Sequence, residues 1–79
     1  MNNTDNIAII RQSPIVSIPG LHPARVVLAR NRATDQYFTC LEIHKPGRGP
    51  ERLAFNKELP SIREASRDFD VRRTALEGA

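Results

Sequence analysis

The sequence contains one cysteine, no tryptophan and no long run of apolar residues. Because Cys40 is alone, no internal disulfide can form, which excludes a secreted scaffold held together by disulfides. No segment approaches the ~18 consecutive apolar residues that a membrane-spanning helix needs. The polar amino terminus, Met1 to Asn6, lacks the basic region of a secretory signal. We therefore expect a cytoplasmic protein without a membrane partner.

The chain has 79 residues, which is enough for one small domain and too few for two. Leu, Ile, Val and Phe together account for 20 residues, more than a disordered chain of this length would carry. We expect a single domain over residues 1–79 with one modest core. Such a core is marginal, so a chain this short can gain stability by forming a homodimer or by binding another partner.

The charged residues are unevenly distributed along the chain. Arginine supplies 10 of the 12 basic residues, and with 9 acidic residues the net charge is +3. Residues 1–20 and 61–79 each sum to zero, so the whole excess lies in residues 21–60. The arginine fork suits phosphates and carboxylates, although a GC-rich genome also favours arginine over lysine without any function. A positive middle segment would attract nucleic acid or an acidic protein surface.

Residues 24–57 carry the pattern of three strands joined by short connections. The stretches 24–32 and 36–44 are rich in β-branched or aromatic residues, and 51–57 alternates between apolar and polar side chains. Short connections favour antiparallel pairing, so we expect a β-meander over residues 24–57. Prolines interrupt residues 7–20, which suits an edge strand or an extended arm.

After Pro60 the apolar spacing changes to that of a helix. Ser61 and Glu64 fit a capping box, and Gly78 marks the end of a helix over residues 61–77. One face of this helix carries four apolar residues that can cover the sheet: Ile62, Ala65, Phe69 and Leu76. The sequence therefore predicts an α+β domain, in which a small antiparallel sheet of three to four strands is covered on one face by a C-terminal helix. Residues 1–6 are expected to form a disordered tail.

The end of the helix leaves two alternatives open. Arg73 falls on the apolar face, whereas Val71 falls opposite it. Either the last turns extend beyond the sheet and the Arg73 side chain reaches solvent along it, or the helix breaks near Asp68 to Asp70.

Alternation in the strands assigns their side chains to two faces of the sheet. If the apolar set packs under the helix, the opposite face carries Arg25, Glu42, His44, Arg52 and Asn56. An open, basic face of this kind suits contacts to phosphates and base edges. The alternative is an ordinary solvated sheet face.

The connection Lys45–Pro50 contains two basic residues and two glycines. Its backbone could approach a phosphate, with Lys45 and Arg48 as counter-charges, although a mobile hairpin loop explains the same composition. The spacing of a P-loop is absent. The full set of candidate residues for binding nucleic acid or a partner is Arg25, Arg30, Arg32, His44, Lys45, Arg48, Arg52 and Asn56.

The residues that could perform catalysis are sparse. His22 and His44 are isolated, and neither has a Ser or Cys at a motif spacing. Cys40 and His44 are four residues apart, which on a strand separates them by roughly 13 Å along one face. We therefore expect no enzyme activity, no cofactor and no metal site.

Two family resemblances point to DNA. The segment from Ser61 to Leu76 resembles the helix-turn-helix of many small DNA-binding domains, with Arg72, Arg73 and Thr74 opening its recognition helix. Residues 24–78 resemble the three-stranded-sheet-plus-helix DNA-binding domains at the amino ends of phage integrases. The matching features are the order of elements, the aromatic strand 36–44 and the pair Glu64-Ala65 early in the helix. This second resemblance implies that the sheet enters the major groove and the helix backs it.

Two functions from different classes follow. The first is a non-enzymatic module that binds nucleic acid through a basic sheet face. The alternative is a phage- or plasmid-encoded protein inhibitor of the anti-CRISPR type, or an accessory factor, that binds a host protein complex. Proteins of that type are often single α+β domains of this size without catalytic motifs. A structural subunit of a larger complex comes third.

Overall fold

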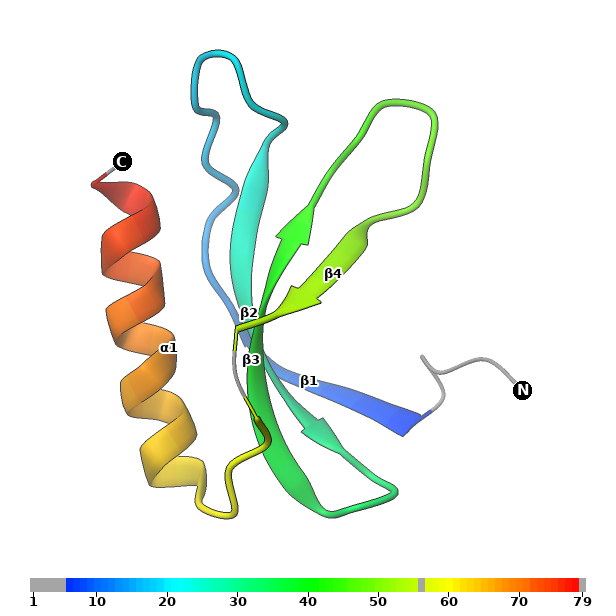
Figure 1. The fold of residues 1–79 in the computed structure, drawn as a ribbon, viewed down its shortest axis with the longest axis vertical. Helices are drawn as coiled ribbons and strands as arrows, with labels where there is room; N and C mark the ends of the chain where they lie inside the picture. The colour runs from blue at the N-terminus through cyan, green and yellow to red at the C-terminus, as the bar shows by residue number, and fades with distance from the viewer. Residues whose placement is uncertain (1–5, 56, 79) are drawn as a thin grey trace.

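The computed structural model describes residues 6–55 and 57–78 (Figure 1). The described part contains four strands and then one helix: β1 (Ile7–Gln12), β2 (Ala24–Asn31), β3 (Gln36–Ile43), β4 (Glu51–Ala54) and α1 (Ile62–Glu77). The strands form one antiparallel sheet in chain order, and α1 packs on one face of it against β2 and β3. The predicted α+β domain, with its small antiparallel sheet and covering C-terminal helix, is confirmed. No helix among these residues has the length and hydropathy to cross a membrane.

Short connections hold the meander in register. The β2–β3 turn ends at Asp35, whose φ of 59° lies in the left-handed region that Asp tolerates better than most residues. The Asp35 backbone N–H donates to the carbonyl of Asn31 at 2.7 Å, which closes the turn. In the β3–β4 loop, Gly47 has a φ of 73°, a conformation that glycine adopts without strain.

The segment before the meander forms the edge strand and arm that its prolines predict. β1 pairs with β2 at the edge of the sheet, and a bulge shifts the register between Ile9 and Arg11. Beyond β1, Ser13 continues the pairing: its N–H donates to the Val26 carbonyl, and its hydroxyl accepts from the Val26 N–H, both at 2.9 Å. Of the tail expected over residues 1–6, residues 1–5 lie outside the described residues. The carbonyl of Asn6 accepts from the backbone N–H of Arg32 at 2.6 Å.

The predicted cap begins α1. The Ser61 hydroxyl accepts from the backbone N–H groups of Arg63 at 3.1 Å and Glu64 at 3.5 Å. These bonds satisfy two of the donors that every helix start leaves without an intrahelical partner.

The helix runs without a break from Ile62 to Glu77, so this segment contains no turn of the kind that separates the two helices of a helix-turn-helix. Ion pairs between residues three and four apart support the region around Asp70: Arg73 lies 3.8 Å from Asp70 and 3.1 Å from Glu77. Val71 is 61% exposed, and the Arg73 side chain extends along the surface toward its acidic partners. The break near Asp68 to Asp70 is therefore absent, and the last turn still reaches the sheet, because Leu76 packs against the core.

The main core lies between α1 and the sheet. Phe69 and Ala65 of the helix pack on Val26 and Leu28 of β2, and four half-buried side chains surround them: Tyr37, Phe55, Leu59 and Leu76. Two guanidinium groups extend this core at its margin. Arg11 lies 4.6 Å above the ring of Phe69, and Arg72 lies 4.6 Å above the ring of Phe55. The Thr39 hydroxyl also donates a hydrogen bond to Asp68, which ties β3 to the helix.

The other face of the sheet is concave. In Figure 1, β1 and β4 both extend away from α1, and residues of both edge strands line a cavity on the side that the helix leaves uncovered. Val27, Ala29 and Cys40 at the base of this concave face are buried, and Ile7 and Phe38 pack against them. The face opposite the helix is thus less open than the sequence suggested, because the edge strands curl over its apolar middle.

Candidate nucleic-acid interface

Three neighbouring strands each place one charged residue on the concave face. Arg25 of β2 lies opposite Glu42 of β3, and Glu42 lies opposite Arg52 of β4. Directly opposed residues of an antiparallel ladder point to the same face, which is why alternation alone predicts that these side chains meet. His44 follows two residues after Glu42 and reaches the same carboxylate. We call these four residues the Glu42 cluster.

The carboxylate of Glu42 lies at the centre of the cluster and is fully buried. Arg25 Nε donates to Oε1 at 2.8 Å, and Arg52 Nε donates to Oε2 at 2.9 Å. His44 Nε2 lies 2.9 Å from Oε1. The side chains of Arg25, Arg52 and His44 are 25%, 26% and 32% exposed. They enclose the carboxylate while each keeps an edge in solvent.

Two opposing effects act on the pKa of Glu42. Burial by itself raises the pKa, because a low-dielectric interior disfavours the charged form. Hydrogen bonds from Arg52, Arg25 and His44 stabilise the carboxylate and outweigh burial, so the pKa lies below its ordinary value of 4.5. Glu42 is therefore ionised at neutral pH. Two arginines against one carboxylate leave the cluster with one net positive charge when His44 is neutral.

The geometry leaves both arginines able to bind a second anion. Each reaches Glu42 through Nε, which is one of the five N–H donors of a guanidinium. The donors on the Nη nitrogens remain for another acceptor, in the planar arrangement that matches phosphate and carboxylate oxygens. Because Glu42 already fixes the two side chains, little further rotamer freedom is lost when a ligand binds.

The β3–β4 loop continues from the same end of the sheet. Lys45 Nζ donates to Glu51 at 2.8 Å, and this bond lowers the pKa of Glu51 below its ordinary value. Arg48 at the tip of the loop is exposed and forms no ion pair with any carboxylate of residues 6–55 and 57–78. The structure thus brings Lys45 and Arg48 to the end of the molecule that carries the Glu42 cluster. Of the two, Lys45 is held in an ion pair with a described carboxylate and Arg48 is not.

Two predicted site residues lie elsewhere and one lies outside the described residues. Arg30 pairs opposite Tyr37, which places its side chain on the helix-facing side of the sheet, and its guanidinium bonds Asp35 at 2.7 Å. Arg32 follows in the β2–β3 turn, at the far end of β2 from Arg25. Asn56 lies outside the described residues. Sequence reasoning therefore grouped two separate ends of the sheet into one site.

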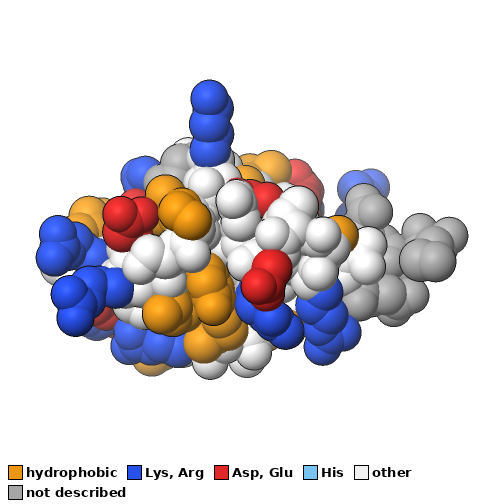
Figure 2. All heavy atoms as spheres, turned by 90° about the horizontal axis from the view of Figure 1, so that it is seen from below, with side chains coloured by type: hydrophobic (Ala, Val, Ile, Leu, Met, Phe, Trp, Pro, Cys, Tyr) orange, Lys and Arg blue, Asp and Glu red, His pale blue; other side chains and the backbone are white. Residues whose placement is uncertain are grey.

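The basic residues at the end of the sheet that carries the β2–β3 turn are dispersed. Figure 2 views the end of the molecule at which the β2–β3 turn and the start of α1 lie. Lys and Arg side chains stand around its margin, interrupted by acidic and apolar side chains, and form no single continuous patch. The Glu42 cluster and the β3–β4 loop are therefore the better candidates for an anion-binding surface.

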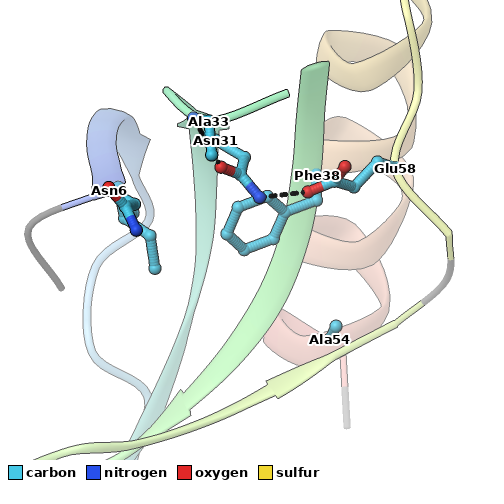
Figure 3. Close-up of a pocket in the computed structure, with 7 residues that line it drawn as sticks. Asn6, Asn31, Ala33, Phe38, Ala54 and Glu58 are labelled. Carbon is cyan, nitrogen blue, oxygen red and sulfur yellow. Dashed lines mark hydrogen bonds between the residues drawn. The ribbon is translucent and has the colours of Figure 1, made fainter. Parts of the chain in front are cut away.

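A cavity that was not predicted from the sequence lies at the other end of the concave face (Figure 3). It has a volume of about 340 Å³, and Phe38, Asn31, Glu58 and Ala54 are among the residues that line it. Alternation could have indicated Phe38, because it shares a face of β3 with Cys40 and Glu42. No local signal places Glu58 there, since it arrives from the connection between β4 and α1.

The single thiol lies on the same face but is enclosed. Cys40 is 1% exposed, and burial raises the pKa of its thiol from 9.0 to about 11, despite the nearby charge of Arg52. In residues 6–55 and 57–78, no three His, Cys, Asp or Glu side chains come together in a group that could hold a metal ion.

The fold and this surface define a small α+β domain with an arginine-bearing concave sheet. No protein-family model, curated protein or solved structure matches the chain.

Proposed function

We propose that this chain is a small non-enzymatic protein that binds nucleic acid through the arginine-bearing end of its concave face. The observation that carries the proposal is the anchoring of Arg25 and Arg52 on the buried carboxylate of Glu42. Two guanidinium groups held in this way present fixed donors for phosphate oxygens. The exposed Arg48 on the adjoining loop adds a third cation at the same end.

The distribution of charge and the order of elements support the proposal. The +3 charge of the chain lies in residues 21–60, which include the Glu42 cluster and the β3–β4 loop. The three-strand-and-helix order on which the resemblance to phage integrase domains rests is present in β2, β3, β4 and α1. Only a few basic residues lie at this end of the sheet. We therefore expect roughly three to five neutralised phosphates and correspondingly weak binding.

The second candidate function is a protein that binds and inhibits, or assists, a host protein complex. An apolar pocket of about 270 Å³ favours it, at the junction of the arm, the sheet and the end of α1. Leu21 of the arm is 67% exposed there, and Ile43 and Leu76 form part of the lining. Exposed apolar surface bordered by polar groups is typical of protein-binding sites.

Salt-dependent binding tests the proposal. Labelled single-stranded and duplex oligonucleotides of the same sequence are titrated with the protein at low and at moderate salt, and fluorescence anisotropy is measured. Neutralising Arg48 and Arg52 with R48Q and R52Q should weaken binding and flatten the slope of log K on log salt. If each arginine neutralises one phosphate, the slope changes by up to about 1.8 for duplex and about 1.4 for a single strand.

Arg63 and Arg67 provide a matched control, because both are exposed on α1 and form no ion pair with a described carboxylate. R63Q with R67Q removes the same charge and should leave the slope unchanged. A larger effect of this control pair would move the interface to the helix and refute the proposed face. Should R52Q impair folding, K45Q with R48Q changes the loop alone. Absence of binding to either oligonucleotide at low salt would overturn the proposal in favour of protein binding.

A further inference from the structure

The cavity on the concave face lies at the opposite end from the Glu42 cluster. Figure 3 shows the ring of Phe38 at its centre, with Asn31 and Glu58 on one side and Ala54 on another. Its volume of about 340 Å³ falls within the range of small-ligand sites, about 300–1,000 Å³. Its walls come from both edges of the sheet, since Ile7 of β1 and Ala54 of β4 both line it.

The polar side chains of the cavity are fixed before any ligand arrives. Asn31 Nδ2 donates to Glu58 Oε2 at 2.7 Å, and the Thr34 hydroxyl donates to Glu58 Oε1 at 2.9 Å. The backbone N–H of Ala33 donates to Asn31 Oδ1 at 2.9 Å. These bonds tie the β2–β3 turn to the connection that leads into α1. A preorganised polar edge therefore stands beside the aromatic ring.

The chemistry of the cavity selects a flat group with N–H donors and disfavours an anion. Each oxygen of Glu58 accepts one hydrogen bond, and a carboxylate offers about four lone-pair positions in all, so acceptor capacity remains. A negative carboxylate repels phosphate. An aromatic ring beside hydrogen-bond acceptors is instead the combination with which proteins hold unpaired nucleobases, through stacking and contacts to the base edge.

The distance along β3 between the Phe38 cavity and the Glu42 cluster is longer than the spacing of successive nucleotides. Phe38 and Glu42 lie on the same face of β3, four residues apart, which is roughly 13 Å along the strand. Duplex phosphates of one strand are spaced about 3.4 Å along the axis, so the cavity and the arginines would meet different nucleotides. A base that is paired and stacked in a duplex cannot enter the cavity without being flipped out, which adds an energetic cost.

We infer that the concave face binds single-stranded nucleic acid, with one unpaired base in the Phe38 cavity and the neighbouring phosphates on Arg25 and Arg52. This inference rests on the proposed function and names its substrate class. Single-stranded DNA and single-stranded RNA carry the same base and phosphate chemistry, so both enter the test.

The experiment measures anisotropy for four labelled probes at one low salt concentration: a short single-stranded DNA, the RNA of the same sequence, the DNA duplex, and the DNA strand with abasic sites. A single strand, whether DNA or RNA, should bind more tightly than the duplex, and the tighter of the two identifies the source. Removing the bases should weaken binding about tenfold, because the base no longer stacks on an aromatic side chain.

Two matched substitutions place the base in the cavity. F38L keeps an apolar side chain but removes the ring, so it should weaken binding of the normal strand and leave the abasic strand unchanged. F55L makes the same change in the core on the helix side of the sheet, where the ring of Phe55 packs under Arg72. It should alter neither affinity. Circular dichroism confirms that each variant is folded, and a loss of fold would lower both affinities together.

The outcomes separate this inference from the function on which it rests. If duplex binds as tightly as either single strand, or if abasic and normal strands bind equally, the protein binds nucleic acid but the base cavity is refuted. If F55L has the same effect as F38L, the cavity is likewise refuted. If no probe binds, both the proposed function and this inference fail.

Discussion

Replacing Glu42 with Gln tests whether the buried carboxylate organises the concave face. The substitution keeps the size of the side chain and removes its charge. In the parent protein, Arg25 and Arg52 both donate to this carboxylate at 2.8–2.9 Å. In E42Q, two like charges face each other across a neutral amide that has only one strong acceptor oxygen. We expect a less stable fold and looser arginines.

The magnitude follows from burial. Removing one partner of a buried ion pair typically costs about 3–5 kcal/mol. Arg25 and Arg52 are about one-quarter exposed and can turn toward water, so we expect a smaller loss of about 2–4 kcal/mol. A domain of 79 residues has a total stability of only about 4–12 kcal/mol. The thermal midpoint should therefore fall by about 10–30 °C at pH 7, measured by circular dichroism.

The stability that Glu42 contributes should depend on pH and decrease in acid. The pKa of Glu42 is lowered by folding, so between the folded and unfolded pKa values the unfolded chain binds more protons. The stability that Glu42 contributes is therefore fully present above its ordinary value of 4.5 and is lost as the pH falls through the folded pKa. The difference in thermal midpoint between parent and E42Q should be largest at pH 7 and shrink in acid, where a protonated Glu resembles Gln.

Glu51 supplies the control, because it pairs with Lys45 at the protein surface near the same end of the sheet. E51Q should lower the thermal midpoint far less than E42Q, since exposed ion pairs contribute little to stability. An equal loss in both variants would show that burial of Glu42 is irrelevant. An E42Q loss that is the same at pH 7 and in acid would show that side-chain packing, and not charge, holds the cluster together.

Three further predictions concern the core, the helix cap and the thiol. F69A should destabilise the domain by about 3–5 kcal/mol, because Phe69 is 1% exposed at the sheet–helix interface; an unchanged urea midpoint would contradict this. S61A should lower stability by about 1 kcal/mol and loosen the first turn of α1, which hydrogen exchange at Glu64 can detect. Cys40, with a pKa of about 11, should react with iodoacetamide at pH 8 about 100-fold or more slowly in the folded protein than in urea; equal rates would mean that the thiol is accessible.

The elements of the fold were predictable because each has a local cause. A composition rich in β-branched or aromatic residues marked β2 and β3, and period-two alternation marked β4. The change of period after Pro60, with Ser61 as cap, marked α1. The sequence left open whether the helix continues through Asp70, and part of what favours the unbroken helix lies outside the helix. The bond from Thr39 to Asp68 comes from β3, and the pairing of Arg11 with Asp70 at 3.7 Å comes from β1. A sequence pattern within the helix cannot contain either contact.

The sequence predicted which residues of the candidate site share a face of the sheet, but not how deeply they are buried or where a cavity forms. Alternation placed Arg25, Glu42 and Arg52 together, and the register confirms that these residues are neighbours. It could not show that Glu42 is fully buried, because this burial depends on how the side chains of Arg25, Arg52 and His44 enclose the carboxylate. The Phe38 cavity was not predictable either, because it is lined by segments that are distant in the sequence.

A buried carboxylate such as that of Glu42 is unusual in so small a domain, because it contributes little net stability to the fold compared with apolar residues of similar size. Replacing a buried ion pair with apolar residues of similar size is often neutral or stabilising, so folding alone gives little reason for a buried carboxylate between two arginines. The arrangement has a clearer reason if the arginines themselves are needed at the surface. Two adjacent guanidinium groups repel each other, and the central carboxylate lowers that repulsion while it fixes both side chains through Nε. A phosphate that binds their Nη donors would then complete a sequence of alternating charges from the interior to the solvent. On this argument Glu42 is a positioning residue. It is buried between Arg25 and Arg52 because it holds both guanidinium groups at the surface, where the proposed function of the concave face needs them.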